Sequence, residues 1–167
     1  RAPSSRKHDL RILMKKRIIA LGLLWCLSAV MLQAARVDTV LVRSAAMNKD
    51  VKVVYVLPDK AIGKQACPVV YLLHGYGGNA RSWVQLKPEL PQMADEKGII
   101  FVCPDGKNSW YWDSPENPAY RYETFVTSEL VKYTDGNYAT IPDRKARAIS
   151  GLSMGGHGAL WSAIRHK

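Results

Sequence analysis

A serine between glycines, at the point where a strand gives way to a helix, constrains this chain more than any other feature. The segment ISGLSMGGHGAL places Ser153 at the centre of a G-x-S-x-G pattern, with Gly151 before it and Gly155 after it. In a sharp strand-to-helix turn of this kind the serine takes a strained backbone conformation, and the glycines leave room for the helix to approach the sheet. The alternative interpretation is an ordinary helix start in which Ser153 has no chemical role.

The rest of the chain predicts the α/β class, with a mainly parallel sheet, because buried strands alternate with helices. Residues 37–44 alternate between apolar and polar, which predicts a strand with one exposed face, and apolar or β-branched runs predict strands over 51–58, 68–75 and 99–106. A further strand is predicted over 145–150, where the chain enters the glycine turn. Helical patterns cover 88–98, 120–138 and 154–167. Residues 107–120 contain two prolines and predict a long loop.

The first 35 residues predict an upstream extension followed by a secretory signal peptide. Three basic residues, Lys15 to Arg17, precede an apolar run of 15 residues from Ile18 to Leu32, and small residues follow at 33–36. A membrane span needs about 20 apolar residues, so the shorter run favours a signal peptide. The alternative is that the segment stays uncleaved as an N-terminal anchor, which is the only membrane contact that we expect. We therefore expect the protein to be exported, to the periplasm or out of the cell.

The formal net charge of +10 does not indicate a nucleic-acid partner. Residues 1–35 hold seven basic residues and one acidic residue, whereas the remaining chain holds 17 basic and 13 acidic residues. Most of the excess therefore belongs to the leader. Cys67 and Cys103 are the two cysteines beyond it, and two free thiols are expected, with a disulfide permitted by export as the alternative.

Backbone amides beside the serine turn are candidates to stabilise negative charge. The segment LLHGYGGN ends a buried strand in a glycine-rich loop, where the amide of Tyr76 is the expected donor, and the amide of Met154 begins the helix after the serine. His74 could serve as a general base, but a histidine at a strand end more often holds a loop by hydrogen bonds, which is the role we expect. His157 is expected to pack beneath the turn.

The segments HGYGGNARSW, PDGKNSWYWDSP, YETFVTSELVKY and RAISGLSMGGHGAL carry a resemblance that extends over about residues 37–167. Together they resemble the esterase family that includes S-formylglutathione hydrolase (esterase D), tributyrin-type, feruloyl and acetyl-xylan esterases, and the mycolyltransferases. The resemblance implies an α/β-hydrolase fold, a Ser–Asp–His triad, and no metal or organic cofactor. By position it implies that Ser153 is the nucleophile and that the amides of Tyr76 and Met154 form the oxyanion hole.

The triad that the resemblance implies is incomplete within the sequence. In the family an Asp and then a His follow the serine, but here no acidic residue follows Ser153, and the two histidines after it, His157 and His166, share one predicted helix. We therefore expect residues 36–167 to be the N-terminal portion of an α/β-hydrolase domain, with the triad Asp and His beyond Lys167. The 167-residue chain alone is then expected to have little or no activity.

Three aromatic residues in the predicted loop, Trp110, Tyr111 and Trp112, are candidate substrate contacts, because aromatic faces can stack on a sugar or ferulate ring. A packing lid is the alternative. Export favours a carbohydrate-attached ester as the substrate, because the hydrolysis of S-formylglutathione is a cytosolic reaction. The predicted function is a serine carboxylic-ester hydrolase acting on acetyl or feruloyl esters of carbohydrates. The alternatives are an acyltransferase of the same fold, an S-formylglutathione hydrolase and a non-catalytic binding module.

Overall fold

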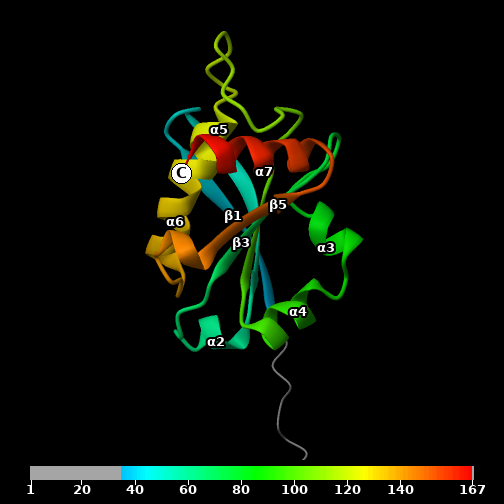
Figure 1. Ribbon diagram of the computed structural model, residues 1–167, viewed down its shortest axis with the longest axis vertical. Helices are drawn as coiled ribbons and strands as arrows, with labels where there is room; N and C mark the ends of the chain where they lie inside the picture. Colours follow the sequence, from blue (N-terminus) through cyan, green and yellow to red (C-terminus); the bar gives the residue numbers. More distant parts are fainter. Residues whose placement is uncertain (1–34, 167) are drawn as a thin grey trace, which may run out of the picture. The chain divides into compact units, whose positions relative to one another are not determined.

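The computed structural model describes residues 35–166; residues 1–34, which carry the predicted extension and signal peptide, lie outside the described part. A sheet of five strands in the order β1-β2-β4-β3-β5 forms its centre (Figure 1). The strands are β1 (Arg36–Ser44), β2 (Lys49–Leu57), β3 (Val69–Leu73), β4 (Ile100–Pro104) and β5 (Arg147–Gly151). The ends of each strand lie within two residues of those of a predicted strand, so all five predicted strands are confirmed.

The sheet is mixed, and its parallel part is confined to β3, β4 and β5. β1 pairs antiparallel with β2, and β2 pairs antiparallel with β4. β3 lies between β4 and β5 and is parallel to both, and its register aligns Leu73 with Gly151. Since the carboxyl ends of β3 and β5 meet at one edge of the sheet, the glycine-rich loop after β3 begins beside the serine turn after β5.

Helices cover both faces of the sheet. They are α2 (Asp59–Ile62), α3 (Ser82–Leu86), α4 (Leu90–Lys97), α5 (Tyr122–Thr124), α6 (Leu130–Asn137) and α7 (Met154–Arg165). A π-helical turn (Phe125–Glu129) joins α5 to α6, so the helix predicted over 120–138 is one stretch with a widened turn inside it. A 3₁₀ turn (Arg144–Ala146) precedes β5. α2 and α3 were not predicted, because helices of four or five residues leave no periodic pattern.

Two hydrophobic cores lie on the two faces of the sheet, and β2 contributes to both. Val53 and Tyr55 belong to the core with α5, α6 and α7, while Val54 and Val56 belong to the core with α3 and α4. Figure 1 shows α6 and α7 on one side of the strands and α3 and α4 on the other. Side chains of a strand alternate between faces, so the continuous apolar run of β2 is explained by burial on both sides.

The expectation about the cysteines can be compared with the described part, whereas the predicted apolar segment 18–32 lies outside it. Cys67 and Cys103 are buried free thiols, as predicted, and burial raises the pKa of the Cys103 thiol to about 12. Among residues 35–166, no helix combines the length and the apolar character that crossing a membrane requires.

Glu123 in α5 ties the far end of α7 to the neighbouring helix. Its carboxylate is nearly buried and accepts hydrogen bonds from Trp161 Nε1 at 2.7 Å, Arg165 Nε at 2.8 Å and His166 Nε2 at 2.8 Å. Burial alone would raise the pKa of this carboxyl, but the three hydrogen bonds outweigh burial and hold the pKa below its ordinary value. The ionised carboxylate therefore stabilises the position of the helix that begins at Ser153.

We predict that Glu123→Gln lowers the free energy of unfolding by about 1–3 kcal/mol at pH 7, since hydrogen bonds to a charged acceptor are replaced by bonds to a neutral amide. A lowered pKa in the folded state stabilises the fold at pH values above the unfolded pKa, near 4.5, and this stabilisation is lost as the pH falls. The difference in the free energy of unfolding between wild type and variant should therefore decrease as the pH is lowered from 7 to about 3. Urea unfolding at several pH values measures it.

The matched control is Glu116→Gln, because Glu116 is exposed and its carboxylate makes no hydrogen bond or ion pair within the described residues. Its unfolding free energy should stay within about 0.5 kcal/mol of wild type. An equal loss in the two variants would show that Glu123 has no special role in holding α7.

Candidate active site

Ser153 lies at the tip of a strained turn between β5 and α7. Its backbone has φ 54° and ψ −114°, a left-handed region that a serine seldom adopts, and the residue is exposed to solvent. Such a conformation costs about 1–3 kcal/mol and persists only where surrounding contacts enforce it. The turn predicted from the G-x-S-x-G pattern is therefore present, and it holds the serine out from the sheet.

Close contacts between α7 and the strands enforce this turn, and they explain both glycines. A Cβ atom on Gly155 would overlap the carbonyl of Leu73 at the end of β3, and one on Gly151 would overlap the backbone of Gly155. The amide of Leu152 also donates to the Leu73 carbonyl at 3.2 Å. The first turn of α7 therefore packs directly on β3, and the requirement for glycine on both sides of Ser153 is confirmed.

The glycine-rich loop after β3 lies against the serine, as the strand register requires. A Cβ atom on Gly75 would be 3.7 Å from Ser153 Cβ and 3.4 Å from the Leu152 carbonyl. The two amides expected to act as oxyanion donors flank this contact, Tyr76 in the loop and Met154 at the first position of α7. Among the hydrogen bonds of residues 35–166 neither amide is a donor, so both are free to bind an incoming oxygen.

His74 holds the loop and does not act on the serine. Its imidazole is buried, the Gly106 amide donates to Nε2 at 2.9 Å, and Nδ1 donates to the Gly75 carbonyl at 2.7 Å. Asp105 Oδ1 lies 3.6 Å from the same Nε2, too far for a hydrogen bond, so the amide fixes the neutral tautomer. The loop-holding role predicted for His74 is confirmed.

Asp105 holds the start of the loop that follows β4. Its carboxylate accepts from the backbone amide of Lys107 at 2.9 Å and from the Lys107 ammonium at 2.8 Å. Burial alone would raise the pKa of this carboxyl, but its hydrogen-bonded and charged neighbours hold the pKa well below the ordinary range. Asp105 is therefore ionised and anchors the loop that carries the three consecutive aromatic residues.

Tyr111 corrects the expectation that all three aromatic residues could contact a substrate. Its side chain is fully buried, and its hydroxyl accepts from the His74 amide at 2.9 Å and donates to the His74 carbonyl at 3.3 Å. The ring packs on Gly158 of α7, where an added Cβ would be 2.6 Å from Tyr111 Cβ. Burial raises the pKa of this hydroxyl, which stays protonated. Tyr111 is therefore a packing residue between β3 and α7.

Trp110 and Trp112 remain exposed, with 45% and 49% of their surfaces accessible. Trp110 and Tyr111 both have positive φ, 57° and 58°, which turns one side chain outward and the next inward. The carbonyl of Trp110 accepts from His157 Nδ1 at 3.1 Å, and its ring meets the His157 ring edge-on. Trp110 therefore lies beside the first turn of α7, which begins at Ser153.

No general base reaches Ser153 within the described residues. His74 is bound by the loops, His157 packs between Trp110 and Trp161 on the exposed side of α7, and His166 is bound to Glu123. His157 does contact two aromatic rings, but the residue is exposed, so the expectation that it packs beneath the turn is wrong. Within the described residues, the turn therefore presents an exposed serine hydroxyl and two backbone amides without an acceptor.

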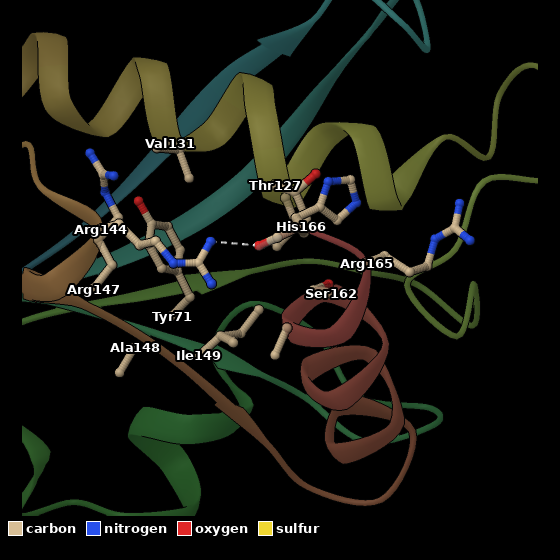
Figure 2. A pocket seen from close by; sticks show the side chains of 12 residues that line it. Tyr71, Thr127, Val131, Arg144, Arg147, Ala148, Ile149, Ser162, Arg165 and His166 are labelled. Carbon is tan, nitrogen blue, oxygen red and sulfur yellow. Dashed lines mark hydrogen bonds between the residues drawn. The ribbon is translucent and has the colours of Figure 1, made fainter.

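A hollow of about 820 Å³ lies between β5, α7 and the π-helical turn, but Ser153 does not line it (Figure 2). Three of its polar lining atoms are buried without a hydrogen-bond partner in the described part: Tyr71 Oη, Arg147 Nε and Ser162 Oγ. A cluster of three or more potential metal-binding side chains is absent from residues 35–166. The chemistry of the candidate site therefore rests on the serine turn and its amides.

Comparison with known proteins agrees with this geometry. The family model described as "Putative esterase" matches residues 44–167. An acetyl esterase from Caldicellulosiruptor saccharolyticus is 28% identical over 131 residues, which cover 74% of this chain and 48% of the relative. The chain spans about half the length of the curated relatives it matches.

Solved structures show the same fold. An S-formylglutathione hydrolase from Agrobacterium tumefaciens is 27% identical with a TM-score of 0.69, covering 80% of this chain and 57% of the other. A ferulic acid esterase is 31% identical with a TM-score of 0.68, covering 79% of this chain and 56% of the other. With a family match over most of the described residues, the chain belongs to the Putative esterase family and has the α/β-hydrolase fold.

Proposed function

We propose that the protein is a serine carboxylic-ester hydrolase and that Ser153 is its nucleophile. The observation that carries the proposal is the strained backbone of Ser153, at φ 54° and ψ −114°, beside two amides that donate to nothing else in the described part. A fold keeps a strained exposed serine at the start of a helix when the side chain must project toward a ligand. The helix N-terminus also favours negative charge there.

The reaction follows from this arrangement. Ser153 Oγ attacks the carbonyl carbon of the ester while a base accepts the hydroxyl proton, and the carbonyl oxygen becomes an oxyanion that the amides of Tyr76 and Met154 bind. Collapse of this intermediate breaks the bond to the alcohol, which leaves with a proton and gives acyl-Ser153. Water then attacks the acyl carbon in the same way, which releases the carboxylic acid and restores the serine.

The base that this mechanism needs is proposed to come from chain outside the described residues. Each histidine within them has another partner, and relatives of about twice this length have room for an Asp and a His after the serine. The 167-residue chain alone is therefore proposed to turn over esters slowly or not at all, because loss of a triad base costs several powers of ten in kcat.

Acetyl and feruloyl esters of carbohydrates are the proposed substrates. Trp110 exposes an aromatic face next to the start of α7, and Trp112 is exposed two residues further along the same loop; such faces stack on sugar and phenolic rings. Similarity to an acetyl esterase and to a ferulic acid esterase supports this class. Export, proposed from the basic and apolar pattern of the leader, would place the enzyme where it meets carbohydrates outside the cytoplasm.

We predict that Ser153→Ala, in the protein expressed from its complete reading frame, lowers kcat for 4-nitrophenyl acetate by at least about a thousandfold, because no other group can form the acyl-enzyme. Steady-state kinetics measure it. Ser150→Ala is the matched control, since Ser150 is also exposed and lies three residues earlier in β5. Equal turnover by Ser153→Ala and wild type would contradict the proposal, and product analysis with an added sugar separates hydrolysis from acyl transfer.

We predict that Trp112→Ala lowers kcat/KM for methyl ferulate by about fivefold to tenfold, because an aromatic contact contributes on the order of 1 kcal/mol. The decrease in kcat/KM for 4-nitrophenyl acetate should be smaller, because the small acetyl group has no aromatic ring to contact the tryptophan. Trp112→Phe keeps an aromatic face and should retain most of the activity on methyl ferulate. Equal values for wild type and Trp112→Ala would exclude Trp112 from the acyl site.

A further inference from the structure

The peptide that carries the Tyr76 amide is held by its neighbours and not by its own side chain. Tyr76 is 66% exposed, and its side chain makes no hydrogen bond within the described residues. The amide can stabilise an oxyanion only if it keeps a fixed direction relative to Ser153. What fixes the loop on each side of Tyr76 therefore decides whether the amide can act.

On the N-terminal side, the loop is held by His74. The backbone of His74 is bound at both its amide and its carbonyl by the buried Tyr111 hydroxyl, and its imidazole joins the Gly75 carbonyl to the Gly106 amide. These bonds lie among buried atoms, so this half of the loop is part of the packed core.

On the C-terminal side, one side chain from the neighbouring loop holds the Gly77 amide, and further along the Asn79 amide donates to Ser82 Oγ of α3 at 2.8 Å. The amide of Gly77 donates to Asn108 Oδ1 at 2.8 Å, although the two residues are 31 positions apart. Gly77 has φ 75°, and a Cβ atom added to it would meet nothing within 4 Å, so packing on that side does not hold the residue. The amide of Gly78 adds a bond within the loop, to the Gly75 carbonyl at 3.0 Å, but no tie to another segment.

We propose that Asn108 is a positioning residue that fixes the Tyr76 amide toward the carbonyl oxygen of an ester at Ser153. Asn108 holds the residue after Tyr76 through its hydrogen bond with the Gly77 amide. On the other side of Tyr76, the buried Tyr111 hydroxyl holds the backbone of His74. Asn108 touches neither the substrate nor Ser153 in this role. The inference rests on the proposed esterase function, because it assigns a role within that same site.

The first test replaces Asn108 in the protein expressed from its complete reading frame. Asn108 is exposed, so Asn108→Ala should fold normally. We expect kcat for 4-nitrophenyl acetate to fall about tenfold with KM changed less than about twofold, since complete removal of an oxyanion donor costs about 100-fold to 1,000-fold and a mobile donor costs less. A purely structural role would change neither value.

Asn117→Ala is the matched control. Asn117 is an exposed asparagine of the same loop region whose Oδ1 also accepts a backbone amide, that of Ala119 at 3.0 Å, and that bond does not involve the glycine-rich loop. It should leave kcat unchanged. A kcat within twofold of wild type for Asn108→Ala, in an enzyme whose turnover depends on Ser153, would overturn the proposed role.

A second measurement does not depend on activity. The Gly77 amide should exchange its hydrogen at least about fivefold faster in Asn108→Ala, because a hydrogen bond that protects it is gone. Asn108→Asp keeps an acceptor oxygen and should retain the slow exchange. Unchanged exchange in Asn108→Ala would overturn the inference. Turnover that persists in Ser153→Ala would instead overturn the proposed function, and the exchange comparison would still decide whether Asn108 holds the loop.

Discussion

The direct contact between the first turn of α7 and the end of β3 is the constraint on which the candidate site depends. Because Gly155 has no side chain, the helix lies against the Leu73 carbonyl, and the chain can reach it from β5 only through the strained backbone of Ser153. The same contact brings Gly75 against Ser153, so the free amides of the next residues, Tyr76 and Met154, adjoin this contact. The positions of the proposed nucleophile and of the proposed oxyanion donors therefore depend on the same close packing.

The loop after β4 makes this arrangement rigid. Tyr111 fills the space between Gly158 of α7 and the backbone of His74, so it couples the helix that follows Ser153 to the loop that carries Tyr76. The two positive φ values at Trp110 and Tyr111 are the cost of turning a single loop both into the core and out to solvent. The positive φ values of this loop thus place Tyr111 in the core and leave Trp110 exposed beside the proposed acyl site.

The sequence was most informative where one local pattern determines the structure. Continuous apolar runs located the buried strands, alternation located β1, and G-x-S-x-G located the turn, because all three patterns depend on neighbouring residues alone. The hidden role of Tyr111 could not be predicted in the same way, since three consecutive aromatic residues carry no signal for which one turns inward. The support given by Asn108 depends on a contact across 31 residues, and only the strand order β4-β3-β5 brings those residues together.

The most direct test of the account is to trap the acyl-enzyme. The protein expressed from its complete reading frame would be mixed with 4-nitrophenyl acetate, quenched with acid within the first turnovers and digested for mass spectrometry. We predict an acetyl group on the peptide that contains Ser153, localised to Ser153 and absent from the Ser153→Ala variant. Rapid release of 4-nitrophenol with no acetyl group on Ser153, or with the acetyl group on another residue, would contradict it.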